Sequence, residues 1–271
     1  MEGIHLSFSD WSRTRFAALR SLMTPLRPLW SIDALKQLAI LSAFYVAYVV
    51  ARWMSGGQEV KARQTGDAVM RAERAMHVYI EPWVQSMMSH WDPLLTFFNL
   101  YYVYCHLTVM LLCLGWLYVR DPRRFGPYRN WIMTINAMAL VFYMLLPTAP
   151  PRLTHTSGIV DTLWLLSPVN FEGGFMAETA NVYAAIPSLH FSWALFVSMA
   201  ILMSTSNRWL RAFAIIHPTI MLLTIIVTGN HWLLDAVAAA VVVLAAYMLA
   251  VRGGRALEHP DLDVERNRSL Q

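Results

Sequence analysis

Two short strings place ionisable side chains inside apolar stretches of this chain. PSLH occupies residues 187–190 and HWLLD occupies residues 231–235, so His190, His231 and Asp235 fall within runs long enough to cross a bilayer. An ionisable group at membrane depth is costly, by roughly 2.5 kcal/mol or more for a central Asp, and by default it marks a functional site. These three residues are therefore the first candidates for chemistry.

His231 and Asp235 lie four residues apart. If HWLLD opens a helix, the two side chains share a face, and the carboxylate can accept a hydrogen bond from one ring nitrogen while the other nitrogen points outward. An imidazole held in this way is an aimed nucleophile. The same spacing also suits a buried polar contact between helices, and the pair alone leaves both interpretations open.

The PSLH string suits the start of a helix that binds an anion. Proline fits the first turn of a helix, so Ser188 and Leu189 are expected where free backbone N–H groups bind anions. His190 follows within the same turn.

Arg152 is the only Lys or Arg between residues 147 and 186, and its planar guanidinium matches the oxygens of a phosphate. Asn230, beside His231, is a second candidate phosphate ligand, or else it ends the preceding helix. A cationic clamp, an anion-binding helix start, an oriented nucleophile and a second histidine as acid together predict phosphoryl transfer through a phosphohistidine. This chemistry requires no metal and no cofactor.

The elements that position these residues are predicted to be membrane helices. Hydrophobic residues make up 57% of the 271 residues and charged residues 14%, which leaves too little polar surface for a soluble globule. We expect an all-α polytopic membrane protein with six transmembrane helices in a bundle, at residues 35–54, 94–119, 131–146, 188–203, 209–228 and 232–251. The net charge of +4 comes from Arg clusters beside these runs, which suits membrane lipids and not a nucleic acid.

Basic residues also predict the orientation in the cell membrane. They crowd the N-terminal segment 1–34, the loops after the second and fourth runs, and the tail 252–271, so these parts are expected in the cytoplasm and the membrane domain 35–251 carries its site on the extracytoplasmic face. The basic segment before the second run does not fit the rule. Within it, apolar residues recur at three- and four-residue spacing over about 67–88, which predicts an amphipathic helix in the interface, with Pro82 as the point where it could break. This helix is either structural or shapes lipid entry.

Further polar residues are candidates for contacts with a substrate headgroup. His106 lies in the middle of the second apolar run, where a histidine is more often a satisfied core residue. Glu81, Asp161 and Asn181 fall near the extracytoplasmic ends of the runs, and each suits either a headgroup contact or the cap of a helix or turn.

The motifs resemble the type 2 phosphatidic acid phosphatase superfamily, whose pattern is K-x6-R-P, then P-S-G-H, then S-R-x5-H-x3-D. They look most like the bacterial relatives of inositol phosphorylceramide synthase, with PTAPPR at 147–152, PSLH at 187–190 and TGNHWLLD at 228–235. The resemblance implies a nucleophile at His231 oriented by Asp235 and an acid at His190. It also implies that Arg152 and Ser188 hold the phosphate of a lipid substrate, which passes to water or to an alcohol acceptor such as inositol.

Three positions depart from the superfamily pattern. Leu145 stands where the pattern has lysine, Ile225 where it has arginine, and Leu189 where it has glycine. Two cations of the phosphate cage are therefore absent, which also admits a second class of function, a non-catalytic lipid-phosphate binder or transporter. The two histidines and Asp235 favour the enzyme, since binding alone would need only cations.

Overall fold

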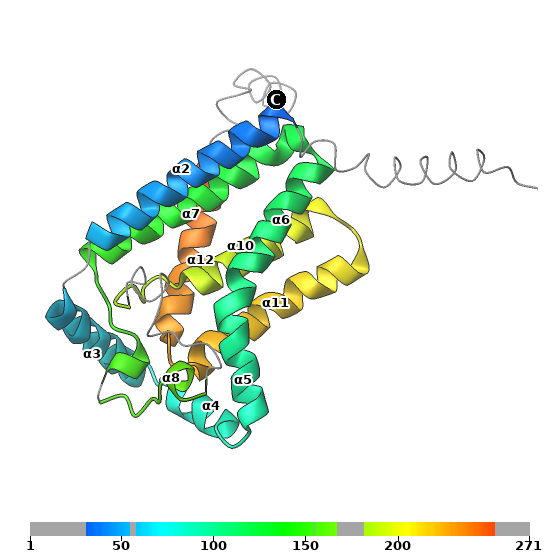
Figure 1. Ribbon diagram of the computed structural model, residues 1–271. Helices are drawn as coiled ribbons and strands as arrows, with labels where there is room; N and C mark the ends of the chain where they lie inside the picture. Colours follow the sequence, from blue (N-terminus) through cyan, green and yellow to red (C-terminus); the bar gives the residue numbers. More distant parts are fainter. Residues whose placement is uncertain (1–30, 55–57, 155, 167–181, 253–271) are drawn as a thin grey trace, which may run out of the picture.

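The computed structural model describes residues 31–54, 58–154, 156–166 and 182–252 (Figure 1). The predicted basic N-terminal segment and the polar tail lie almost entirely outside the described residues, and so does Asn181. The described part is helical and contains no β-strand beyond an isolated bridge between Thr148 and Ala184. The predicted all-α class is therefore confirmed for these residues.

Helices occupy all six of the predicted apolar runs. Their bounds are α2 (Ile32–Met54), α5 (Asp92–Leu100) continued through η2 (Tyr101–Cys105) into α6 (His106–Arg120), α7 (Phe125–Leu145), α10 (Leu189–Ser204), α11 (Arg208–Val227) and α12 (Leu233–Tyr247) continued by η5 (Met248–Arg252). Shorter elements are α3 (Glu59–Ala75), α4 (Glu81–Met88), η3 (Pro122–Arg124), η4 (Pro151–Leu153) and α8 (Thr162–Leu166).

Four of the described helical segments are long and apolar enough to cross a membrane, namely Ile32–Val49, Asp92–Arg120, Arg208–Val227 and Leu233–Ala250. The chain is therefore a membrane protein by the length and composition of its helices. Helix α10 is apolar but has 16 residues. Helix α7 is longer, with 21 residues, but it contains Arg129, Asn130 and Asn136 and is not among the four segments.

Helix α10 lies at the centre of the bundle, against α6, α7, α11 and α12, while α2 runs along α7 (Figure 1). A helix that is apolar on every side is buried, which suits α10 to this place. The largest core cluster surrounds Trp131 of α7 and Phe196 of α10, whose rings meet edge to face with centroids 5.0 Å apart. Trp131 Nε1 also donates to Val243 O of α12 at 2.9 Å, so the three helices are joined inside the core.

The predicted amphipathic segment consists of two helices, α3 and α4, and the chain between them breaks before Pro82, where a break was expected. Pro82 lies in the first turn of α4, where its missing N–H costs nothing, and His77 between the helices has a positive φ of 57°. One face of α3, with Ala62, Gly66 and Val69, is buried. A Cβ added to Gly66 would lie 2.8 Å from Ala149 O, so only glycine lets α3 approach the 147–152 string this closely.

Candidate active site

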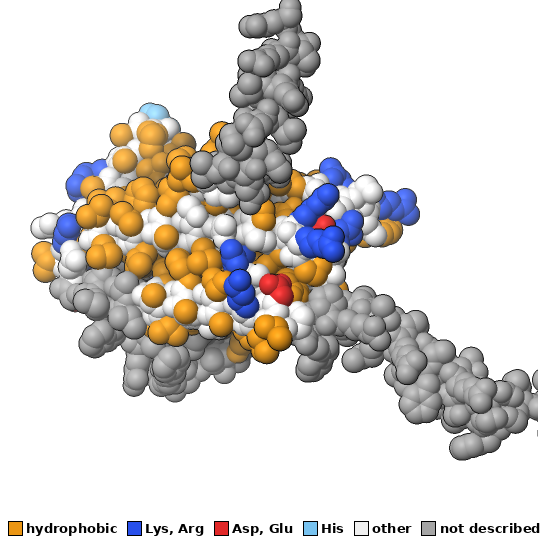
Figure 2. Space-filling view, turned by 90° about the horizontal axis from the view of Figure 1, so that it is seen from above, with side chains coloured by type: hydrophobic (Ala, Val, Ile, Leu, Met, Phe, Trp, Pro, Cys, Tyr) orange, Lys and Arg blue, Asp and Glu red, His pale blue; other side chains and the backbone are white. Residues whose placement is uncertain are grey.

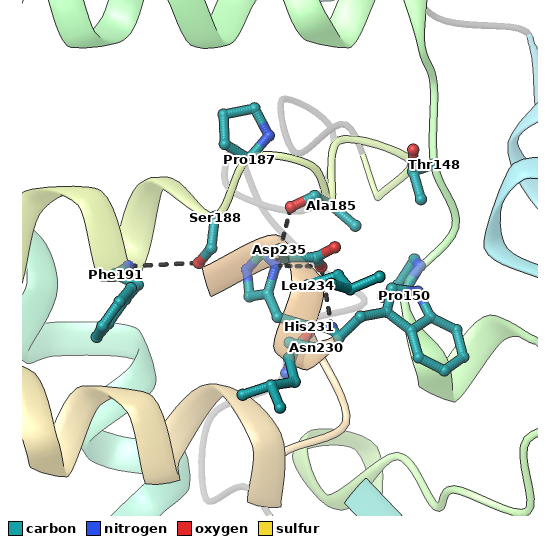
Figure 3. Close-up of polar contacts among 12 residues, drawn as sticks. Thr148, Pro150, Ala185, Pro187, Ser188, Phe191, Asn230, His231, Leu234 and Asp235 are labelled. Carbon is teal, nitrogen blue, oxygen red and sulfur yellow. Dashed lines mark hydrogen bonds and ion pairs between the residues drawn. The ribbon is translucent and has the colours of Figure 1, made fainter. Parts of the chain in front are cut away.

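His231 and Asp235 are in contact beside the start of α12 (Figure 3). His231 Nδ1 lies 3.1 Å from Asp235 Oδ2 and 3.1 Å from Ala185 O. Since both neighbours are acceptors, Nδ1 carries the hydrogen in the neutral ring and Nε2 keeps its lone pair. His231 is 4% exposed and Asp235 is fully buried, so the pair is held away from bulk water.

The four-residue spacing predicted that the two side chains share a face of one helix. The structure differs, because His231 lies before the helix. Helix α12 begins at Leu233, two residues after His231. Asp235 instead folds back over the helix start, where Oδ2 accepts a hydrogen bond from Trp232 N at 2.9 Å as well as from His231. A carboxylate at this position satisfies one of the free N–H groups of the helix, so helix capping and imidazole orientation use the same oxygen.

A glycine turn joins α11 to this pair. Gly229 has φ of +68°, and an added Cβ would lie 2.7 Å from Ile159 Cγ2, so both the conformation and the space require glycine. Arg152 N donates to Gly229 O at 3.0 Å. The backbone of Arg152 is therefore bound to Gly229, which lies two positions before His231.

The Arg152 guanidinium has two partners inside the protein. Nε donates to Asn230 Oδ1 at 2.8 Å, and Nη1 pairs with Asp161 Oδ2 at 2.8 Å. Asp161 also caps α8, because Oδ1 accepts from Trp164 N at 3.2 Å. Asn230 thus orients the arginine beside His231, and Asp161 neutralises part of its charge.

The start of α10 is attached to the start of α12. Ser188 N donates to Asp235 O at 3.2 Å, and Ser188 Oγ accepts from Phe191 N at 3.3 Å as the cap of α10. Tyr143 OH donates to Pro187 O at 2.7 Å. The Leu189 side chain packs against apolar clusters, so its backbone N–H is the group suited to an anion.

An aromatic group surrounds His190. Its ring stacks on Tyr102 with centroids 4.0 Å apart, and lies 4.2 Å from the ring of His106 and 5.7 Å from that of His231. Tyr102 belongs to the π-helical turn η2, a distortion that often marks functional sites. His106 Nδ1 donates to Tyr102 O at 2.7 Å. Together with the ring contact to His190, this bond places His106 next to the proposed acid.

The described contacts of the nearby basic residues are to groups other than the side chains of the candidate site. Leu145 is 70% exposed at the end of α7, and Ile225 is fully buried. Lys61 Nζ donates to Leu145 O at 3.1 Å, and Arg63 binds Glu59 and Leu153 O. Arg129 lies near the other end of α7 and binds Gln37.

Of two buried carboxylates, Glu73 was missed from the sequence, and the role of Glu81 was left open between two alternatives. Glu73 accepts from Leu234 N at 2.8 Å and Glu81 accepts from Leu233 N at 2.7 Å, and both residues are fully buried. Glu81 is thus a helix cap, one of its two predicted roles, and not an exposed headgroup contact. Glu73 follows Ala62, Gly66 and Val69 on the buried face of α3, and this spacing was a signal for its burial.

Comparisons with known proteins give one family. No curated protein and no solved structure matches the chain. A family model described as the PAP2 superfamily matches residues 67–249, more than half of the chain, and this range contains Arg152, both histidines and Asp235. The chain therefore belongs to the PAP2 superfamily, which points to a phosphatase-type membrane enzyme that acts on lipid phosphates.

Proposed function

We propose that the protein transfers the phosphate of a membrane lipid through a phosphohistidine on His231. The carrying observation is the pair of acceptors at His231 Nδ1, which leaves Nε2 as the nucleophile. Nε2 attacks phosphorus as the bond to the leaving oxygen breaks, and His190 gives that oxygen its proton. Water or an alcohol then attacks the phosphohistidine, His190 takes its proton, and His231 is released.

The cationic half of the site supports the same reaction. Arg152 is one hydrogen bond from Asn230, the neighbour of His231, so its guanidinium is within reach of a phosphate bound at His231. Ser188 and the backbone N–H groups at the start of α10 offer further donors to the equatorial oxygens. The two histidine rings, 5.7 Å apart, are close enough for one phosphate group to contact both.

The substrate we propose is a lipid phosphate, diphosphate or phosphodiester, with water or an alcohol such as inositol as acceptor. The sparse cage supports transfer within the inositol phosphorylceramide synthase-like branch. A single arginine, already paired with Asp161, suits a substrate whose phosphate carries fewer charges than a free monoester. His106, beside His190, is our candidate for contact with the headgroup or acceptor.

The same observation favours a second candidate, a binder or transporter of lipid phosphates without turnover. A clamp that is already neutralised in part binds a dianion weakly, and weak binding suits release. The oriented His231 favours the enzyme, because a pure binder would not need a neutral ring held by two acceptors.

We further propose six transmembrane helices, with α3 and α4 in the extracytoplasmic interface of the cell membrane. Basic residues flank the turn between α6 and α7, at Arg120, Arg123, Arg124 and Arg129. Figure 2 looks down on the bundle from that end and shows Lys and Arg side chains in separate groups across the view. The positive-inside rule assigns that end to the cytoplasm and the histidines to the opposite side. Exposed Met76, Trp83 and Met87 give α3 and α4 an apolar surface for the interface.

The test is mass spectrometry of lipids after the purified protein meets a panel of lipid phosphates, diphosphates and phosphodiesters, with and without inositol. We expect a dephosphorylated lipid or a new inositol phosphate ester, lost in His231→Ala and kept in His90→Ala, a matched change at an exposed histidine. Binding of the lipids with no product from any of them would support the binder instead.

A further inference from the structure

Three carboxylates surround the first N–H groups of α12. Asp235 Oδ2 accepts from Trp232 N at 2.9 Å, Glu81 Oε1 from Leu233 N at 2.7 Å and Glu73 Oε1 from Leu234 N at 2.8 Å. The first N–H groups of a helix have no partner within the helix, and here each is satisfied by a carboxylate from a different element. Helices α3 and α4 thereby hold the residues that adjoin His231.

The second oxygens of Glu73 and Glu81 have no hydrogen-bond donor among the described residues, although both are buried. Their first oxygens bind the N–H groups of two consecutive residues, Leu233 and Leu234, and this places the two carboxyl groups next to each other. Two ionised carboxylates in such contact repel each other, whereas a single proton between them satisfies both oxygens at once. Fewer than two negative charges on the pair would therefore suit this placement.

We propose that Glu73 and Glu81 share one proton and, in that form, are positioning residues that hold the start of α12 and with it His231 and Asp235. This inference rests on the proposed function of His231 for its effect on turnover. In the shared arrangement Glu73 carries the proton and donates it to Glu81, while the other oxygen of each residue accepts from α12. Ionisation of Glu73 would leave two like charges facing each other and push α3 and α4 apart at the helix start.

The surroundings favour the protonated form. Burial raises the pKa of Glu73 to about 9, and the charges of Glu81 and Asp235 act in the same direction. The other titratable group beside the pair is Tyr79, between α3 and α4, and Arg74 lies over its ring at 4.8 Å. The folded pKa is above the unfolded value of 4.5, so the stabilisation is complete below pH 4.5 and is lost as pH rises through about 9.

Three variants separate a shared proton from a plain structural contact. Glu73→Gln keeps the acceptor for Leu234 N and supplies a permanent donor to Glu81, whereas Glu73→Ala removes both. Glu59→Gln is the matched control, because it makes the same change on an exposed carboxylate of the same helix, paired with Arg63.

Two measurements do not depend on activity. We expect a carboxylic-acid C=O band in the infrared spectrum at pH 7 for the wild type and Glu59→Gln that is weakened in Glu73→Gln. The Tm of the wild type should fall by several degrees between pH 6 and 9, and this fall should be reduced in Glu73→Gln. Amide exchange at residues 233 and 234 should be about tenfold faster in Glu73→Ala and unchanged in Glu73→Gln.

Turnover of phosphatidic acid in detergent micelles gives the functional readout. We expect Glu73→Ala to lower kcat with little change in KM, and Glu73→Gln to restore kcat and keep it at alkaline pH where the wild type loses it. Equal infrared bands and equal pH dependence of Tm in wild type and Glu73→Gln would overturn the shared proton. A wild type without turnover would count against the proposed function alone, since the spectra, Tm and amide exchange still judge the pair.

Discussion

The two halves of the candidate site are built differently. The nucleophile half, His231 with Asp235, has side chains that are 5% and 0% exposed, and its carboxylate also caps a helix. The clamp half, Arg152 with Asp161, has side chains that are 16% and 28% exposed and lies on a loop with short helical turns. The nucleophile half, which we expect to keep one geometry, is bound to backbone N–H groups. The clamp half, which we expect to exchange partners, is held by a more exposed pair of side chains.

This contrast gives Asp161 a role in the clamp. An arginine beside a buried site needs a counter-charge when no anion is bound, and Asp161 provides it at 2.8 Å. In the proposed function, an incoming phosphate would compete with that carboxylate for the guanidinium. We therefore expect selectivity for phosphates of low charge.

The largest expected effect comes from breaking the nucleophile half. Asp235→Asn keeps an acceptor for Trp232 N but presents an amide to His231, which favours the wrong tautomer of the imidazole. We expect kcat to fall by about 10²–10⁴-fold while the protein stays folded. Steady-state kinetics with the lipid identified in the panel checks this, and a wild-type kcat would show that Asp235 is only a helix cap.

Substitutions in the clamp half should lower activity less than Asp235→Asn does. Arg152→Ala removes the guanidinium, and we expect kcat/KM to fall by about 10²–10³-fold with loss of vanadate inhibition. Arg152→Lys keeps the charge without the planar fork, so its kcat/KM and vanadate inhibition should lie between those of the wild type and Arg152→Ala. Vanadate inhibition curves for the three proteins check this, and the same curve in all of them would remove Arg152 from the site.

Asp161→Asn should sharpen the comparison in the opposite direction. Removing the competing charge leaves Arg152 freer for an anion, so we expect vanadate to inhibit about two- to fivefold more tightly, the size of a partly exposed ion pair. Glu59→Gln, which breaks another partly exposed pair with an arginine, is the control. Weaker inhibition in Asp161→Asn would mean that Asp161 positions Arg152 and does not compete with substrate.

The smallest expected effect is on labelling, which tests whether the clamp half faces the outside of the cell. Thr156 is exposed on the clamp loop, and Ser206 is exposed between α10 and α11. In a protein with Cys105 and Cys113 replaced by alanine, Thr156→Cys should react with an impermeant thiol reagent added to whole cells, and Ser206→Cys should not. The reverse pattern would place the clamp in the cytoplasm and contradict the proposed orientation.

The helices and the candidate reacting residues could be predicted from the sequence because both leave local signals. Predicted runs and observed helices differ by one residue at each end for α10 and α11, and by six at the start of α7, where Arg129 and Asn130 hid the first turns. His190, His231 and Asp235 stood out as ionisable groups in apolar runs.

The contacts that organise the site left no local signal. Glu73 meets Leu234, 161 residues later, and Asn230 meets Arg152, 78 residues earlier, so neither pair follows from spacing along one helix. The stack of Tyr102 on His190 depends on the π-helical turn, which the periodicity of an α-helix does not predict. The start of α12 two residues after His231 followed from capping by Asp235, which overrode the expected shared face.

The most direct test of the central claim is the capture of the covalent intermediate. The wild type, His231→Ala and His190→Ala would each meet the best lipid substrate from the panel, be denatured in alkali within the first turnover, and be analysed by peptide mass spectrometry. We expect a phosphoryl group on His231 in the wild type, a larger fraction in His190→Ala if its loss slows release more than attack, and none in His231→Ala. Rapid turnover with no phosphate on His231, or with the phosphate on another residue, would contradict the account.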